Sequence, residues 1–186
     1  MPESVSNLTI PYDELANSLR IASSDAQLYQ AIANAPFEYP AETAQLFLSF
    51  ITFCLVDELR HELFLAGTSD TEGYRLSIQG YDFDPASYRI PLDDPKSTLI
   101  KAISSGRPQT TKDWSSLSRP EASEETVRLN QATSGITYSE VYSLSGKVRG
   151  TLMYNFIQYQ GSIGPEQREF MERYTALVTT ELDSRD

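Results

Sequence analysis

The stretch of sequence that decides the fold is ITYSEVYSLSGKVRGTLMYNFI at residues 136–157, which is followed by GPEQREFM at residues 164–171. Two runs rich in aromatic and β-branched residues meet at Ser145-Gly146, and they predict two adjacent strands joined by a turn. Pro165 suits the first position of a helix, and the apolar residues after it recur at helical spacing. The end of the chain is therefore predicted to form a strand, a turn, a second strand and a long closing helix.

The N-terminal residues have the spacing of amphipathic helices. Apolar residues recur at helical intervals over residues 12–19 and again over residues 28–32. Ser24 is predicted as the N-cap of the second helix, with Gln27 reaching back in a capping box, and Pro36 is predicted to end that helix.

A third helix is predicted from Pro40 to about Arg60, because proline suits a first helical position. Residues 46–56 are apolar nearly all round, and a helix of that kind is usually buried on more than one side. A second apolar stripe over residues 170–182 adds to the surface that helices of two copies would bury. We therefore expect a homodimer built through helices.

The residues that follow predict a β-hairpin. Residues 63–66 form a short apolar run, and residues 68–73 form a polar turn. Residues 74–78 then alternate between apolar and polar side chains, which is typical of a strand with one buried face.

The centre of the chain is predicted to contain short elements. Asp94-Pro95 predicts the N-cap and first position of a short helix that Gly106 ends. Residues 108–114 predict an edge strand, where a proline is acceptable. Residues 124–132 predict a further helix.

The composition is that of an acidic globular protein. Of the 186 residues 40% are hydrophobic and 22% are charged, which suits one domain with a substantial core. The net charge of −11 argues against nucleic acid as a partner and disfavours an anionic membrane surface. The N-terminus lacks the pattern of a signal peptide, and residues 44–56, the most apolar stretch, are too few to span a bilayer. We expect a cytoplasmic protein that binds neither nucleic acid nor membrane.

The order of these elements over residues 40–183 resembles that of GAF domains, small α+β modules found mostly in signalling proteins. IPL at residues 90–92 and SSGRP at residues 104–108 resemble the segment before the third strand of that family. GKVRG at residues 146–150 resembles the turn into its last strand, and PEQREF at 165–170 resembles the start of its closing helix. The resemblance rests on the order and spacing of these patterns.

The resemblance implies an α+β fold with a central antiparallel sheet. N- and C-terminal helices would pack on one face of the sheet. Residues 81–133 would form a roof of loops and short helices over a pocket on the other face. Residues 40–186 would be the GAF-like domain, and residues 1–39 an N-terminal helical extension.

Cys54 is the single cysteine, which excludes an intrachain disulfide and fits a reducing compartment. Some phytochrome-like GAF domains attach a bilin through a pocket cysteine, and free-methionine-sulfoxide reductases of this family cycle pocket cysteines through a disulfide. The implied pocket segments, residues 81–142, contain no cysteine, and a thiol between Phe53 and Leu55 is best interpreted as a small buried hydrophobe. The signature of cyclic-nucleotide-binding GAF domains is not matched either. We expect no cofactor and no enzymatic activity.

His61 is the only histidine, and it follows Asp57 by one helical turn, so a carboxylate could orient its imidazole. A metal site would need further ligands close in space. We interpret His61 as a polar residue at a helix end and expect no metal.

Three arginines, Arg89, Arg107 and Arg128, lie near the implied pocket. They could meet an anion there. They could also be exposed partners of carboxylates such as Asp93 and Glu124, which is the interpretation we favour.

Aromatic residues are frequent in and beside the implied pocket. They are Tyr81, Phe83, Tyr88, Trp114, Tyr138 and Tyr142. Because Tyr138, Glu140 and Tyr142 alternate along a predicted strand with Ile136, we expect them on one face. A glutamate between two tyrosines is typical either of a small-molecule pocket or of tyrosines that fill the space with their own side chains.

The predicted ligand-binding residues are Tyr88, Trp114, Arg128, Tyr138, Glu140 and Tyr142. The last three would form the floor of the pocket, over which Trp114 or Arg128 could close. Glu140 and the net charge favour a neutral or cationic ligand over a phosphate. A register slip of one residue would instead turn Thr137, Ser139 and Val141 inward.

The sequence therefore predicts a non-catalytic signalling or regulatory sensor module. It would dimerise, and a small-molecule ligand and a protein signalling partner are the further partners that we consider. The alternative is a protein-interaction subunit with a vestigial pocket. A bound small molecule that co-purifies with the protein would favour the first over the second.

Overall fold

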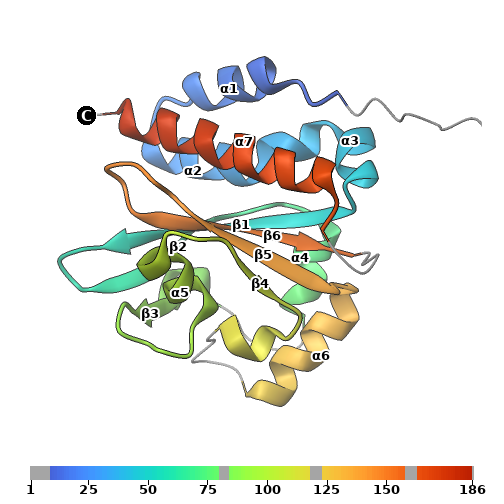
Figure 1. Ribbon diagram of the computed structural model, residues 1–186, viewed down its shortest axis with the longest axis vertical. Coiled ribbons are helices and arrows are strands. Elements are labelled where there is room, and N and C mark those ends of the chain that lie inside the picture. The colour runs from blue at the N-terminus through green and yellow to red at the C-terminus, as the bar shows by residue number, and fades with distance from the viewer. Residues whose placement is uncertain (1–8, 80–83, 118–122, 158–162, 186) are drawn as a thin grey trace, which may run out of the picture.

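The computed structural model of the chain describes residues 9–79, 84–117, 123–157 and 163–185 (Figure 1). A six-stranded antiparallel sheet in the order β3-β2-β1-β6-β5-β4 lies at the centre of these residues. The strands are β1 (Leu48–Asp57), β2 (Glu62–Thr68), β3 (Arg89–Pro91), β4 (Gln109–Thr111), β5 (Tyr138–Ser143) and β6 (Gly150–Phe156).

Helices cover both faces of the sheet (Figure 1). The helix layer consists of α1 (Tyr12–Arg20), α2 (Asp25–Asn34), the 3₁₀ turn η1 (Ala35–Glu38), α3 (Pro40–Gln45) and α7 (Pro165–Asp183). The roof consists of α4 (Glu72–Ser77), η2 (Pro85–Ser87), α5 (Thr98–Ser105), η3 (Trp114–Leu117) and α6 (Glu124–Ser134). The predicted α+β class and its two-sided arrangement are confirmed. Among the described residues, no helix is long and apolar enough to cross a lipid bilayer.

Strand β1 corrects the helix predicted over residues 40–60. Helix α3 covers only the beginning of that range, and the apolar run forms a central strand of the sheet. Ile51 and Phe53 face the helix layer, whereas Phe50 and Cys54 face the roof. A strand buried on both faces has the same continuous apolar composition as a buried helix, and here the β-branched and aromatic residues decide for the strand.

The predicted hairpin is also wrong in its second half. Residues 63–66 belong to β2 as predicted, but β2 pairs with β1, and residues 74–77 lie in α4. The Thr71 side chain caps this helix by accepting the Tyr74 backbone N–H at 3.3 Å. The N-cap and the helical hydrogen bonds therefore prevail over the alternating pattern.

The remaining elements lie close to their predicted positions, with differences at two caps. Ser24 caps α2 as predicted, but the Gln27 side chain accepts hydrogen bonds from Ser23 instead of Ser24. Helix α5 has Ser97 as its N-cap, so Asp94 does not cap it. Gly106 ends α5 in the left-handed conformation at φ 62°, which glycine adopts without steric cost.

Two apolar cores lie on opposite faces of the sheet, and we call them the helix-side core and the roof-side core. The helix-side core joins α1, α2 and α7 to the sheet, with Leu15, Ile32 and Phe170 among its buried members. The described part of the predicted N-terminal extension thus packs in the same core as the closing helix. The roof-side core joins α5, η3 and α6 to the other face, with Leu99 and Trp114 among its members.

Candidate functional site

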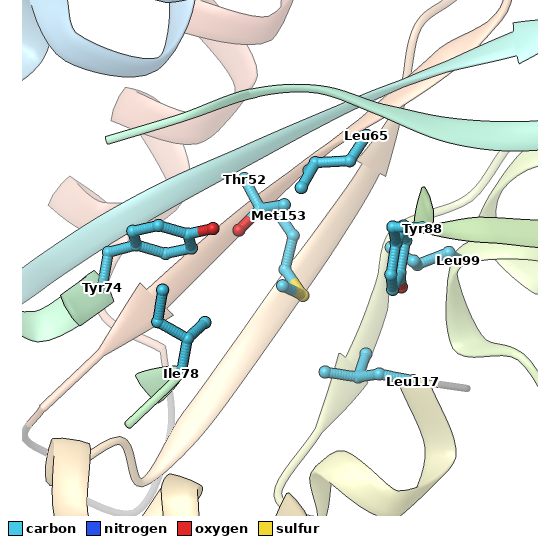
Figure 2. A pocket seen from close by; sticks show the side chains of 8 residues that line it. All are labelled: Thr52, Leu65, Tyr74, Ile78, Tyr88, Leu99, Leu117 and Met153. Carbon is cyan, nitrogen blue, oxygen red and sulfur yellow. The ribbon is translucent and has the colours of Figure 1, made fainter. Parts of the chain in front are cut away.

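A small cavity lies between the roof and the sheet, on the face where the family resemblance implies a pocket. Its lining comes from β1, β2 and β6 on the sheet side and from roof segments on the other side (Figure 2). The lining residues are Thr52, Leu65, Tyr74, Ile78, Tyr88, Leu99, Leu117 and Met153. Figure 2 shows Met153 between Tyr74 and Ile78 on one side and Tyr88 and Leu117 on the other.

The cavity is apolar with a few hydroxyl groups. Among its described lining residues, only Thr52, Tyr74 and Tyr88 carry polar side-chain atoms, and none is charged. The free space measures about 20 Å³, which is enough for about one water molecule. The cavity thus has the chemistry of a small-molecule site, but its volume is far below the several hundred Å³ of a typical one.

A buried polar network holds the roof to the sheet beside this cavity. The Trp114 Nε1–H donates to Ser139 Oγ on β5 at 2.9 Å, and Ser139 Oγ donates to Asn155 Oδ1 on β6 at 2.6 Å. Asn155 Nδ2 donates to the Phe50 carbonyl of β1 at 3.3 Å. From α6, Gln131 Oε1 accepts the Trp114 backbone N–H at 3.0 Å. Because each of these groups has a partner, the network fixes Trp114 in one position.

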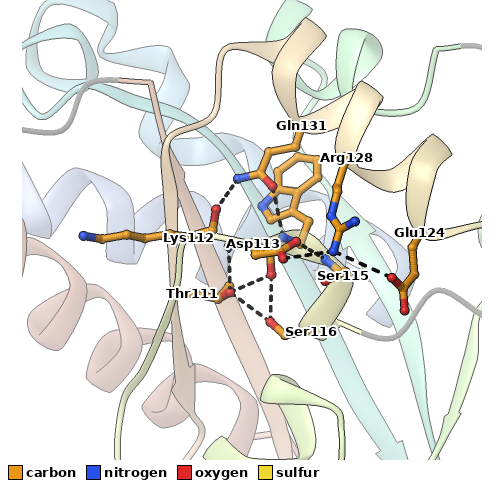
Figure 3. Close-up of polar contacts among 9 residues, drawn as sticks. Thr111, Lys112, Asp113, Ser115, Ser116, Glu124, Arg128 and Gln131 are labelled. Carbon is orange, nitrogen blue, oxygen red and sulfur yellow. Dashed lines mark hydrogen bonds and ion pairs between the residues drawn. The ribbon is translucent and has the colours of Figure 1, made fainter.

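The polar residues around η3 are joined by hydrogen bonds and ion pairs that hold this turn in place (Figure 3). Asp113 Oδ1 accepts the Ser115 backbone N–H at 2.9 Å, and Asp113 Oδ2 lies 3.5 Å from Arg128 Nη2. The Ser115 hydrogen bonds, followed by the charge of Arg128, lower the pKa of the exposed Asp113 carboxyl. Arg128 also pairs with Glu124 at 3.7 Å, as the exposed-partner interpretation predicted. These contacts cap and orient η3.

Three of the predicted ligand-binding residues lie on the roof side, but they do not form one site. Tyr88 lines the cavity and is 7% exposed. Trp114 is fully buried in the roof-side core and is held by the polar network. Arg128 lies on the surface of α6 in ion pairs and is not among the residues that line the cavity.

The other three predicted residues lie on the opposite face of the sheet. Tyr138, Glu140 and Tyr142 do share one face, but Tyr138 and Tyr142 belong to the helix-side core. Their placement as the floor of a pocket under the roof is therefore wrong. Of the alternate set, Ser139 and Val141 point toward the roof, whereas Thr137 is exposed. Ile136, which was expected on the tyrosine face, belongs to the roof-side core instead. Helix α7 covers the tyrosine face, and that packing was not visible in the strand pattern alone.

The other residues that the sequence suggested as functional candidates lie, where the structure describes them, in turns, in the core or in local contacts, and none of them lines the cavity. His61 lies in the β1–β2 turn with φ 56° and not at a helix end, so its predicted helical pairing with Asp57 is wrong. Cys54 is buried in β1, as its interpretation as a small hydrophobe predicted. Arg89 donates to the Tyr88 carbonyl at 2.9 Å and lies over the Phe64 ring. Among the described residues, no group of three or more potential metal ligands comes together. The aromatic candidates at positions 81 and 83 lie outside the described residues.

Sequence reasoning missed most of the residues that line the cavity. They are Thr52, Leu65, Tyr74, Ile78, Leu99, Leu117 and Met153. All but two of these are ordinary apolar residues, whose periodicity indicates burial but not which core they join. A correct assignment of β1 as a strand would have turned Thr52 toward the roof by its alternation with Ile51 and Phe53.

Solved structures resemble this chain over nearly its full length. A methyl-accepting chemotaxis protein, residues 122 to 287, has a TM-score of 0.62 at 11% identity, with 90% of this chain and 94% of that chain covered. The GAF domain of a phosphoenolpyruvate-protein phosphotransferase from Coxiella burnetii has a TM-score of 0.61 at 11% identity, covering 92% and 90%. Free methionine-R-sulfoxide reductase from Neisseria meningitidis, in complex with its substrate, has a TM-score of 0.58 at 15% identity, covering 92% and 86%.

These likenesses establish that the chain has the fold of GAF domains, as the sequence resemblance predicted. No family model and no curated protein matches the sequence. The same fold is present in a chemotaxis protein and in an enzyme, so the fold alone does not assign a function.

Proposed function

We propose that this chain is a regulatory module of the sensor type and that the cavity between roof and sheet is its input site. The observation that carries the proposal is that the cavity is lined from both layers. Strands β1, β2 and β6 line one side, and roof segments between α4 and η3 line the other. A molecule that enters this space changes the packing of the roof on the sheet. The chemotaxis protein and the GAF domains among the similar structures support a regulatory role of this kind.

The lining indicates the class of ligand. A neutral, mostly apolar molecule with one or two hydrogen-bonding groups would match the aliphatic walls and the hydroxyls of Thr52, Tyr74 and Tyr88. A charged ligand would lose its hydration without gaining an ionic partner there. Because the free space is about 20 Å³, such a molecule would have to displace part of the roof.

Native mass spectrometry of the purified chain tests this function. We expect a co-purifying neutral small molecule in the wild type. Leu65→Trp should remove it, because Leu65 lines the cavity and the larger ring would fill it. Phe64→Trp is the matched control, since Phe64 is the neighbouring residue of β2 and packs against the helix-side core. A wild-type chain without any bound mass, or one whose ligand survives Leu65→Trp, would contradict the proposal.

The second candidate is a protein-interaction subunit with a vestigial pocket. The small volume of the cavity favours it, and so does the filling of the helix-side face by Tyr138 and Tyr142. A ligand-free wild type in the mass-spectrometry experiment would make this the leading function.

A homodimer through helices remains part of the proposal, although its original grounds do not hold. The apolar run at residues 46–56 is covered on both faces within one chain, and the stripe of α7 is buried against the sheet. Light scattering at tens of micromolar protein tests the dimer directly, and a monomeric mass would remove it from the proposal.

We propose no catalytic role. Cys54 is the single thiol of the chain and lies buried in a central strand, where burial in apolar surroundings makes a thiol unreactive. The reductase among the similar structures therefore supports the shared fold and not a shared reaction.

A further inference from the structure

Glu140 is a buried carboxyl group at the edge of the sheet. It lies on β5, is 4% exposed, and faces the helix layer between the edge strand β4 and helix α7. Its neighbours across the ladder are Thr110 on β4 and Tyr154 on β6. A carboxylate in this position has lost most of its hydration, so its protein partners decide its charge.

Those partners are few. Glu140 Oε2 accepts a short hydrogen bond from Thr110 Oγ1, and no cation of the described residues lies within ion-pair distance of it. Glu181 makes a useful contrast, because it is 8% exposed and pairs with Arg20 Nε at 3.1 Å. Glu140 is thus a buried glutamate without the compensation that Glu181 has.

The groups around Glu140 come from four elements. Helix α7 contributes the charge of Arg168, and β5 itself contributes Tyr142, on which the charge of Glu172 from α7 also acts. On the β4 side Thr110 bonds the carboxyl and Lys112 follows just beyond the strand. On β6 the Tyr154 hydroxyl is engaged with Thr175 at 2.8 Å.

Tyr142 adds a second observation on the same face. Its hydroxyl is buried, the residue is 7% exposed, and the hydroxyl has no hydrogen-bond partner. Burial, followed by the charge of Glu140, raises the pKa of Tyr142 to about 12, so this group stays protonated. The charge of Glu140 acts on this hydroxyl, but no hydrogen bond joins the two groups, so Tyr142 does not compensate a buried charge on the carboxyl.

We propose that Glu140 makes the β4–β5 edge proton-sensitive. With the carboxyl protonated, β4 and α7 close over a neutral group that keeps its hydrogen bond with Thr110. With the carboxylate ionised, water enters to hydrate the charge and β4 separates more readily from β5. Strand β4 leads into η3, which carries Trp114 and Leu117 of the roof, so the state of Glu140 also affects how firmly the roof is held.

The direction of the pH dependence follows from the environment. Burial raises the pKa of Glu140 above its ordinary 4.5, and the Thr110 hydrogen bond and the Arg168 charge oppose this in part. The closed edge therefore binds the proton more tightly than the open edge does. The stabilisation of the closed edge is complete below about pH 4.5 and is lost as the pH rises through the pKa of the folded chain.

Carbon-13 NMR of the complete chain, followed by native-state hydrogen exchange, tests the proposal. The carboxyl carbon of Glu140 should titrate with a midpoint above 4.5. As the pH rises through this midpoint, exchange at the β4 amides that donate to β5, corrected for intrinsic rates, should accelerate by about tenfold for each pH unit by which the pKa is raised. A midpoint at or below 4.5 would overturn the proposal without any variant being made.

Two variants complete the test, and neither depends on a bound ligand. Glu140→Gln keeps the shape without the charge, so the corrected exchange of β4 should become independent of pH and slower at neutral pH. Glu181→Gln changes another buried glutamate, one that has an ionic partner, so it should leave the pH dependence of β4 unchanged. Equal pH dependence in the wild type and in Glu140→Gln would contradict the proposal. Because native mass spectrometry tests the cavity separately, either proposal can fail without the other.

Discussion

The two cores of this molecule differ in how completely they are packed. On the helix side, aromatic rings stack directly: Tyr138 on Phe156 at 4.7 Å between centroids, and Phe170 on Tyr174 at 5.6 Å. On the roof side, short elements meet around a cavity and are held by a polar network through Ser139. The long helices thus form a rigid scaffold, and the adaptable packing is confined to the face that carries the candidate site.

The largest effect is expected from opening the helix-side core. Phe170→Ala should lower the free energy of unfolding by about 4 kcal/mol, because the ring is fully buried between Tyr154 and Tyr174. Leu117→Ala on the roof side should cost about 2 to 3 kcal/mol, since fewer atoms are removed and they already border a void. Urea unfolding of both variants measures the difference. Equal losses would contradict the contrast between the two cores.

The next effect concerns the polar network of the roof. Ser139→Ala should cost about 2 to 3 kcal/mol, because it leaves the Trp114 indole N–H and the Asn155 amide oxygen without this partner in a buried place. Ser143→Ala in the same strand is the control and should cost less than about 1 kcal/mol, because Ser143 is only partly buried. Near-UV circular dichroism of Trp114 provides a local readout. An unchanged spectrum and stability for Ser139→Ala would mean that the network does not hold the roof.

A smaller contrast separates two tyrosines of the helix-side core. The Tyr174 hydroxyl donates to the Ile32 carbonyl at 2.8 Å, so Tyr174→Phe should cost about 1 to 2 kcal/mol. The Tyr142 hydroxyl has no partner, so Tyr142→Phe should be neutral or slightly stabilising near pH 7. Thermal unfolding compares them, and a loss for Tyr142→Phe as large as that for Tyr174→Phe would reveal an additional partner of Tyr142.

The smallest effect is expected at the surface of the roof. Arg128→Ala removes exposed ion pairs to Asp113 and Glu124 and should change the free energy of unfolding by less than about 1 kcal/mol. If a ligand co-purifies with the protein, this variant should retain it, because Arg128 lies outside the cavity lining. Loss of the ligand in Arg128→Ala would instead support its predicted role in binding.

The ends of helices were the part of the fold that the sequence predicted best, because residues within one turn determine them. Pro165, Gly106 and Ser24 mark ends of helices by chemistry that acts within one turn, and each was placed correctly. Strand β1 was missed because a strand with helices on both sides loses the alternation that identifies strands in a sequence. That error then shifted the hairpin onto residues that form α4.

The candidate site was less predictable for a related reason. The alternation of Tyr138, Glu140 and Tyr142 correctly placed them together, but alternation does not say which of two apolar layers a face meets. The answer depends on helix α7, which lies later in the sequence. The cavity itself is formed mainly by ordinary aliphatic side chains, such as Leu65 and Met153, which carry no signal beyond burial.

The position of β1 in the sheet has a consequence for the order of folding. Its partner on one side, β2, follows within a few residues, but on the other side Thr52 pairs with Met153. During synthesis β1 therefore has one open edge until about a hundred further residues have been made, and such long-range pairing is slow to form. An unpaired, strongly apolar strand is a template for association with other chains. A chain shortened before β6 should therefore aggregate, because the edge of β1 that pairs with β6 stays open.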